Sequence, residues 1–307
     1  MALHYESDGK PYVVLGGHKI ELERDTFTEK YYIEKAENEL RETPENVEKG
    51  LRELRELLKG EPNLVIPIGN DAFMMKFLRP CKFYADSAFK RIKAYYKFRL
   101  SHADYCRDVT PSATQAAFKH SIVSMLSPRD KQGRRLLVVE SGERWKPRDV
   151  PLAEMFRAVQ ISLESAVEEP RTQVSGVNVI LNVQGLTLSH IMHFTPSFAK
   201  MVVDWIQDCI PVRLKGVHII NQPFIFNMLF AIFKPFLSTK LRSRIHFHGS
   251  DTQSLLKYID ASQLVQRFGG NLPENEEHGE IMWKMLCYYE QDFKVKSSEG
   301  YVNNNNK

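Results

Sequence analysis

Six basic side chains lie close together in one part of this sequence and suggest a site for an anion. Between Cys209 and Ser250 the chain contains no aspartate or glutamate. The basic residues of this segment are Arg213, Lys215, Lys234, Lys240, Arg242 and Arg244. Lysine and arginine suit phosphate because they supply several charge-assisted donors, and arginine can offer two at once. The segment therefore favours an anionic partner, with a solvated basic face as the alternative.

The motifs of catalysis and metal binding are absent from the sequence. It contains no G-x-S-x-G, P-loop, G-x-G-x-x-G or H-E-x-x-H pattern. Ser189 and His190 are adjacent but are not part of a triad pattern. His246 and His248 would share one face of a strand, and no third metal ligand is evident beside them. We therefore expect that the protein is not an enzyme and needs no metal or cofactor.

The most apolar segment is residues 223–237, which contain five phenylalanines and only two polar side chains. It is about five residues short of the roughly 20 that a membrane-spanning helix needs. As a helix it is apolar nearly all round, so both faces need an apolar neighbour. It is therefore either a core helix or a gate over an apolar cavity. The basic segment beyond it favours a gate that opens at an anionic membrane.

Length and composition indicate one large α/β domain with a small helical annex. The chain has 307 residues, of which 43% are hydrophobic and 26% charged. The first residues show no basic and apolar stretch of a secretory signal. The four cysteines are far apart and form no C-x-x-C pair, which indicates reduced thiols in the cytosol.

The elements that must position these residues can be inferred from hydrophobic periodicity. Residues 12–23 read as two short strands about a Gly-Gly turn. Residues 26–108 read as helices, one of them starting at Thr43-Pro44 and ending at Gly60. Strand-like runs then alternate with helical patterns, which predicts a mostly parallel sheet with crossover helices. These runs are 135–140, 177–183, 216–220 and 244–248.

Ordered motifs across residues 45–290 resemble the CRAL-TRIO lipid-binding family, in its branch of tocopherol carriers, retinaldehyde-binding proteins and clavesins. The motifs are FLRPCKF at 77–83, GLTLSH at 185–190, FTP at 194–196, PVRLKGVHIIN at 211–221, KPFL at 234–237, RIHFHG at 244–249 and the late Gly269-Gly270.

The resemblance implies a helical N-terminal module and an α/β bowl, a mostly parallel sheet with crossover helices, closed by a mobile lid helix at 223–237. The expected organisation is a hairpin-like extension at 1–25, the helical module at 26–110, the lipid-binding domain at 111–290 and a disordered tail at 291–307.

The resemblance also implies a set of lipid-contacting residues, and nearly all are apolar, as a hydrocarbon ligand requires. For each of them, ordinary core packing is the alternative. They are Phe156, Val159, Leu163, Val177, Val179, Leu181, Leu186, Phe194, Val202, Ile206, Ile210, Val217, Phe226, Leu229 and Ile232. Val159 and Leu163 stand where the tocopherol carrier has serines, and Leu186 stands at its tryptophan. These departures favour a different ligand, for which Gln160, Ser162 and Glu164 would supply polar contacts.

The phosphoinositide-contacting residues implied by the resemblance are Arg213, Lys215, Lys240 and Arg244, which no acidic residue between 209 and 250 neutralises. A fifth basic position of the family is Cys81 here. The expected function is a cytosolic, monomeric carrier of one tocopherol-, retinoid- or carotenoid-like molecule. It would release this ligand when its basic cleft meets phosphoinositide, during transient contact with endosomal or plasma membranes. The alternatives are a clavesin-type trafficking or signalling module and, less favoured, a hydrolase; no nucleic-acid partner is expected.

Overall fold

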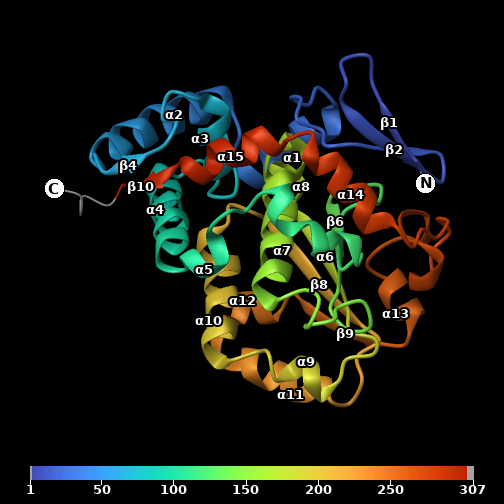
Figure 1. Cartoon of the computed structure of the whole chain (residues 1–307). Helices are drawn as coiled ribbons and strands as arrows, with labels where there is room; N and C mark the ends of the chain where they lie inside the picture. The colour runs from blue at the N-terminus through green and yellow to red at the C-terminus, as the bar shows by residue number, and fades with distance from the viewer. Residues whose placement is uncertain (1, 303–307) are drawn as a thin grey trace.

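The computed structural model describes residues 2–302, which form a helical module beside a five-stranded sheet, with a small sheet near the N-terminus (Figure 1). The module comprises α1 (Lys30–Leu40), α2 (Pro44–Lys59), α3 (Asp71–Leu78) and α4 (Ala85–Ser101). The α2 helix starts as its sequence predicts, because the Thr43 side chain accepts a hydrogen bond from the Asn46 N–H at 3.3 Å. Its buried residues include Leu54 and Leu58.

The central sheet has the strand order β5-β6-β7-β8-β9. Only β5, at the edge, runs antiparallel to its neighbour, so the prediction of a mostly parallel sheet is confirmed. The strands are β5 (Val123–Ser124), β6 (Arg135–Glu140), β7 (Val177–Asn182), β8 (Leu214–Ile220) and β9 (Ile245–Gly249). The bounds of β6, β7, β8 and β9 agree with the four strand-like runs predicted from the sequence to within two residues at each end.

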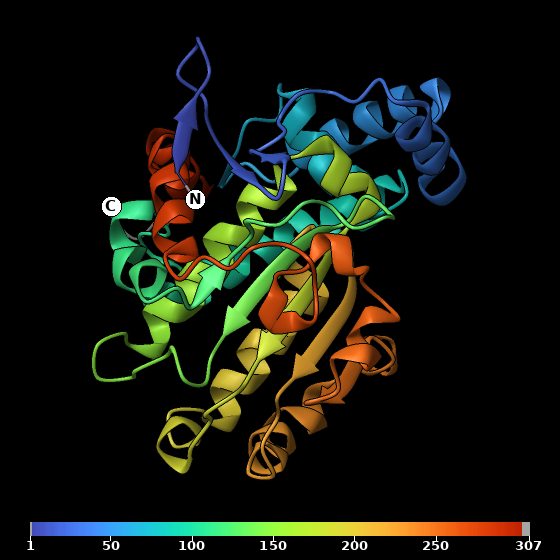
Figure 2. The same cartoon turned by 90° about the vertical axis from the view of Figure 1, so that its right-hand side faces the viewer.

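The crossover segments between the parallel strands pack against one face of the sheet. They include α7 (Leu152–Val167), α8 (Pro170–Ser175), α9 (Leu188–Ile191), α10 (Pro196–Asp204), the π-helical turn η2 (Trp205–Cys209), α11 (Phe226–Phe233), η3 (Lys234–Phe236) and α12 (Thr239–Arg242). The segment after β9 covers the opposite face, where Leu255, Ile259 and Phe268 pack in one cluster with Leu136 and Ile180 of the sheet (Figure 2). Each face of the sheet therefore has its own apolar layer.

Further helices precede β5 or follow β9, and the first ones after β9 lie in the segment that covers the opposite face. These further helices are α5 (Ala103–Cys106), η1 (Pro111–Thr114), α6 (Gln115–Lys119), α13 (Thr252–Leu256), η4 (Ala261–Gln263), η5 (Gln266–Phe268) and α14 (His278–Cys287). Among the described helices, none is both long and apolar enough to cross a bilayer.

The N-terminal extension is a three-stranded antiparallel sheet. It consists of β1 (Leu3–Tyr5), β2 (Pro11–Leu15) and β3 (His18–Ile20). The predicted hairpin about the Gly-Gly turn is confirmed as β2 and β3, with both Gly16 and Gly17 at positive φ. The additional strand β1 pairs with β2, which the sequence alone does not indicate.

The prediction that residues 291–307 are disordered is wrong for residues 291–302, the part that the structure describes. Residues 290–298 form α15 (Glu290–Ser298), and β10 (Gly300–Tyr301) pairs with β4 (Leu64–Val65) of the N-terminal module. The Phe293 side chain is buried, and Lys296 forms an ion pair with Glu168 at 2.5 Å. Burial of one aromatic anchor, together with this ion pair, orders a segment of polar composition. Residues 303–307 lie outside the described part.

A buried ion-pair network joins the N-terminal extension to the sheet. The Glu169 carboxylate is fully buried and forms ion pairs with Arg135 and, at 3.0 Å, with Arg129. It also accepts hydrogen bonds from the Glu23 N–H and the Thr172 hydroxyl. Burial raises the pKa of Glu169, but the two guanidinium groups outweigh this effect and lower the pKa to about 2.

Candidate functional site

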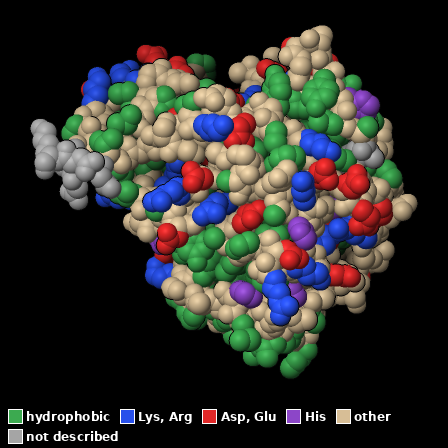
Figure 3. Space-filling view, viewed as in Figure 1, with side chains coloured by type: hydrophobic (Ala, Val, Ile, Leu, Met, Phe, Trp, Pro, Cys, Tyr) green, Lys and Arg blue, Asp and Glu red, His purple; other side chains and the backbone are tan. Residues whose placement is uncertain are grey.

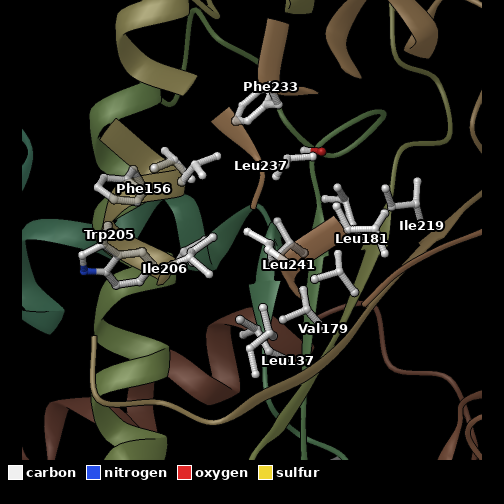
Figure 4. Close-up of a pocket in the computed structure, with 18 of the residues that line it drawn as sticks. Leu137, Phe156, Val179, Leu181, Trp205, Ile206, Ile219, Phe233, Leu237 and Leu241 are labelled. Atoms are coloured by element: carbon white, nitrogen blue, oxygen red, sulfur yellow. The ribbon is translucent and has the colours of Figure 1, made fainter. Parts of the chain in front are cut away.

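An apolar cavity of about 260 Å³ lies between the sheet and the helices that cover one of its faces (Figure 4). The sheet supplies the floor. Because side chains alternate along a strand, every second residue faces the cavity. In this way Val179 and Leu181 line it from β7, and Val217 and Ile219 line it from β8. The floor continues onto β6, where Leu137 and Val139 line the cavity.

One wall of the cavity is a chain of aromatic side chains in edge-to-face contact. The ring centroid of Phe156 on α7 lies 5.2 Å from that of Trp205 and 5.8 Å from that of Phe198 on α10. Phe194 continues the chain, 5.8 Å from Phe198 and 6.1 Å from Phe233 of α11. This last contact joins the fixed wall to the helix that covers the cavity. Edge-to-face pairs of this kind are favourable beyond their area of contact.

The π-helical turn η2 places two further cavity residues and is held from outside. Trp205 and Ile206 line the cavity from this turn, and Ile210 lines it just after. The Arg91 guanidinium of α4 donates to the carbonyl of Ile210 at 2.9 Å. The Gln207 carboxamide oxygen accepts from the N–H of Ser238, just beyond η3. The turn therefore connects the N-terminal module to the end of the segment that covers the cavity. π-Turns are often found at functional sites.

The predicted lid segment covers the cavity as the helix α11. Phe226, Leu229, Phe230 and Phe233 line the cavity at the spacing of one helical stripe. The outer face of the segment is exposed to solvent, with Phe224 91% and Met228 54% exposed. The segment is therefore not a helix enclosed in the core. Leu237 and Leu241 complete the lining beyond η3 (Figure 4).

The structure places all but three of the sequence-derived lipid-contacting residues around this cavity. The exceptions are Val177, which is buried in the main core at the start of β7, and Leu186 and Ile232, which pack in the cluster beneath α9 and α11. The cavity-facing stripe of α11 runs through Phe226, Leu229, Phe230 and Phe233. Ile232 lies one residue, or about 100° of helical rotation, from Phe233, so its side chain packs beside the cavity instead of lining it.

The polar contacts expected from Gln160, Ser162 and Glu164 are wrong, because none of these residues lines the cavity. The Gln160 carboxamide donates to the carbonyl of Tyr105 at 2.9 Å, and the Ser162 hydroxyl donates to the carbonyl of Ala158 at 2.8 Å. Glu164 accepts a hydrogen bond from the Tyr95 hydroxyl of α4 at 2.7 Å. The three side chains therefore make structural contacts away from the cavity.

Sequence reasoning missed several cavity residues that local patterns could have identified. The alternation of β6 carries Leu137 and Val139 onto the floor and continues to Ser141. Ser141 is the only polar side chain among the described residues that line the cavity. Trp205 and Phe198 extend the helical stripe that already contains Val202.

Two of the four predicted phosphoinositide-contacting residues share an acidic partner that the sequence does not reveal. Glu39 of α1 forms an ion pair with Arg213 at 2.6 Å and with Lys215 at 3.3 Å. Arg213 and Lys215 are therefore paired with a carboxylate from outside the 209–250 segment, which itself contains no acidic residue. Burial raises the pKa of Glu39, but its hydrogen bond to Arg213 and the charge of Lys215 lower the pKa below its usual value overall.

Arg244 lies in the same electrostatic neighbourhood as this pair. Burial lowers the pKa of Lys215 to about 8, and the charge of Arg213 acts in the same direction. Burial and Arg213 also lower the pKa of Arg244. Lys240 lies on α12, four residues before Arg244, and is exposed. The described residues form no ion pair with its ammonium group. We call Arg213, Lys215, Lys240 and Arg244 the basic quartet.

An exposed apolar tip lies where α9 and the start of α11 meet, at the bottom of Figure 1. Figure 3 shows hydrophobic side chains gathered over this end of the molecule. The exposed side chains are Leu188 and Met192 beside α9, Phe224 and Met228 near the start of α11, and Phe247 of β9. A patch of this kind typically marks an interaction with a protein or a membrane.

The histidines singled out in the sequence have structural contacts. The His190 ring nitrogen Nδ1 accepts a hydrogen bond from the Thr187 N–H at the start of α9. His246 and His248 stack with His218 on the outer face of the sheet, where His218 Nδ1 lies 3.0 Å from His248 Nε2. Within residues 2–302, no group of three or more histidine, cysteine, aspartate or glutamate side chains could hold a metal ion.

Comparisons with known proteins agree with this geometry. Residues 119–270 match the CRAL/TRIO domain family. The chain is 35% identical over 265 residues to the alpha-tocopherol transfer protein-like protein of Homo sapiens, covering 86% of this chain and 76% of that protein. It is 32% identical over 243 residues to clavesin-2 of Rattus norvegicus, covering 78% of this chain and 74% of the relative.

Among solved structures, the crystal structure of Sfh5 has a similar fold. The TM-score is 0.51 at 12% identity, over 89% of this chain and 100% of that chain. This similarity supports the arrangement of helices around a mostly parallel sheet.

Proposed function

The chain belongs to the CRAL-TRIO family of lipid-binding proteins, and on this premise we propose that it carries one tocopherol-, retinoid- or carotenoid-like molecule in its cavity. The observation that carries the proposal is the apolar lining, in which Ser141 alone among the described residues is polar. Each Å² of apolar surface removed from water contributes roughly 25 cal/mol, so such a lining favours a hydrocarbon ligand. It offers neither the acid nor the base of a hydrolytic site among the described residues, which favours binding over catalysis.

We further propose that the basic quartet binds a phosphoinositide and promotes release of the ligand. Arg213 and Lys215 precede or begin β8, and Arg244 directly precedes β9, so these cations lie at the same end of two neighbouring parallel strands. The segment from α11 to α12 joins the lid to this end of the sheet. An anion bound there contacts both the sheet and the segment beyond the lid.

The exposed apolar tip is the proposed contact with the membrane interior. Its residues would enter the interface between lipid headgroups and acyl chains, while the lid stays next to the bilayer surface. The protein would then act from the cytosol as a monomer and meet endosomal or plasma membranes transiently. Its partners would be a hydrophobic small molecule and a phosphoinositide-containing surface, with no nucleic acid.

The test is to extract the bound lipid from purified protein and identify it by mass spectrometry. The expected result is an isoprenoid molecule at about one equivalent. The matched control is Ile206→Asp, because an unpaired charge in this cavity costs several kcal/mol and should abolish binding. A phospholipid in the parent protein would instead support the clavesin-type trafficking module. Equal lipid content in a folded Ile206→Asp variant would show that the cavity is not the binding site.

A further inference from the structure

The backbone forces the Ser141 side chain into the cavity. Ser141 comes directly after β6, and its N–H donates to the carbonyl of Asn182 at 3.1 Å, which continues the pairing with β7. The preceding residue, Glu140, faces the opposite side of the sheet and is held there by Arg267 at 2.8 Å and Arg144 at 3.3 Å. Because side chains alternate along an extended chain, this anchoring of Glu140 orients Ser141 inward.

The Ser141 hydroxyl differs from the other buried serines nearby. The hydroxyls of Ser162 and Ser165 on α7 each donate to a backbone carbonyl at 2.8 Å. No hydrogen bond to the Ser141 hydroxyl is found among the described residues, although Ser141 is only 6% exposed. Buried polar groups in folded proteins normally have a partner, so this hydroxyl has an unused donor and acceptor inside an apolar cavity.

The position of Ser141 defines one polar end of the cavity. Val139 pairs with Leu181 and Leu181 with Ile219, so these residues form one row across the floor. Ser141 follows Val139 by two residues on the same face of the chain, so it lies just beyond this row, at the carboxyl ends of the parallel strands. At the amino ends, Leu214 and Ile245 line the cavity with hydrocarbon alone. A ligand with one polar end is therefore accommodated in only one direction.

We propose that Ser141 determines specificity for a long hydrocarbon molecule with a single uncharged polar group, a hydroxyl or a carbonyl, which it binds by a hydrogen bond. This inference rests on the carrier function proposed for the cavity and adds the ligand class and its orientation. A serine hydroxyl both donates and accepts, so it serves either group. No cation is present among the described lining residues, which disfavours a carboxylate or a phosphate at this end.

The test measures binding of two probes of equal chain length, hexadecan-1-ol and hexadecane. Each radiolabelled probe is equilibrated between the protein and a cyclodextrin. Ser141→Ala should weaken binding of the alcohol about 5- to 30-fold, which corresponds to about 1–2 kcal/mol. Binding of hexadecane should stay within about 2-fold, because the methyl group of alanine keeps the surface apolar. The control, Ser162→Ala, removes a buried hydroxyl that lies away from the cavity and should change neither affinity.

The outcomes separate this inference from the carrier function. Loss of alcohol binding alone in Ser141→Ala supports the inference. An equal effect of the substitution on both probes, or no effect on either, overturns the role of Ser141 while the cavity remains a lipid site. Failure of the parent protein to bind either probe overturns the carrier function and this inference together.

Discussion

Replacing Glu39 by glutamine should strengthen binding to phosphoinositide-containing vesicles. Glu39 occupies the position of an anion between Arg213 and Lys215, so a phosphate group must displace its carboxylate. Each cation near an anionic membrane surface is worth roughly 1 kcal/mol. Freeing both contributes up to about 2 kcal/mol, or about 30-fold at 1.4 kcal/mol per decade. Because the Glu39 side chain is 39% exposed, solvent already screens the pair, and we expect a gain of about 3- to 30-fold.

The pH dependence of this gain is set by Lys215. Its pKa is about 8, and Glu39 is one of the groups that keep it from falling further. Removing the carboxylate lowers the pKa of Lys215, so the lysine loses its proton at a lower pH than in the parent protein. The gain in vesicle binding should therefore be larger below pH 7 than above pH 8.

The assay is co-sedimentation with two kinds of vesicle, one made of neutral phospholipid alone and one made of the same phospholipid with added phosphatidylinositol bisphosphate. The matched control is Glu37→Gln, which removes the same charge from an exposed position of α1. It should change binding by less than about 2-fold, because Glu37 is exposed on another face of α1 and forms no ion pair with the basic quartet among the described residues. If Glu39→Gln binds no better than Glu37→Gln at low salt, Glu39 does not compete with the lipid phosphate.

Three further predictions concern release, the lid and stability. Changing Lys240 and Arg244 to alanine should weaken binding to the same vesicles by about 10- to 30-fold and slow ligand transfer to them. If transfer at low salt is unchanged, these two residues serve only to keep the surface soluble. Hydrogen exchange in residues 223–237 should slow when ligand binds and quicken on anionic vesicles, and equal protection throughout would indicate a static helix. Glu169, with its pKa of about 2, stabilises the fold above its unfolded pKa of about 4.5. This contribution, up to about 3 kcal/mol, should be lost as the pH falls from 4.5 toward 2, and an acid-unfolding profile unchanged by Glu169→Gln would contradict it.

The sequence predicts most accurately the features that depend on local periodicity. The cap at Thr43 and the bounds of β6 are both determined by residues near one another in the chain. The cavity positions taken from the family resemblance also lie largely where expected, because a shared backbone carries them to the same face.

Long-range pairing limits how much the sequence can predict. Glu39 and Arg213 are separated by 174 positions, and nothing in either segment indicates the other. The order of the C-terminal segment depends in the same way on Phe293 finding a buried position and on β10 finding β4. The polar residues of α7 are misplaced for a local reason: Phe156, Val159 and Leu163 already mark the face that meets the cavity, and Gln160, Ser162 and Glu164 lie to either side of it.

The π-helical turn η2 makes the shape of the cavity depend on the winding of the backbone as well as on its side chains. An ordinary α-helix turns by about 100° for each residue, and a π-turn accommodates one extra residue while the segments on either side keep their phase. If all five residues of Trp205–Cys209 were wound as α-helix instead, the residues beyond them would be rotated by roughly 100°. Ile210 would then lie away from the cavity, and the carbonyl that Arg91 holds would move with it. A chain with one residue fewer in this turn could wind as an ordinary helix and still present Ile210 to the cavity.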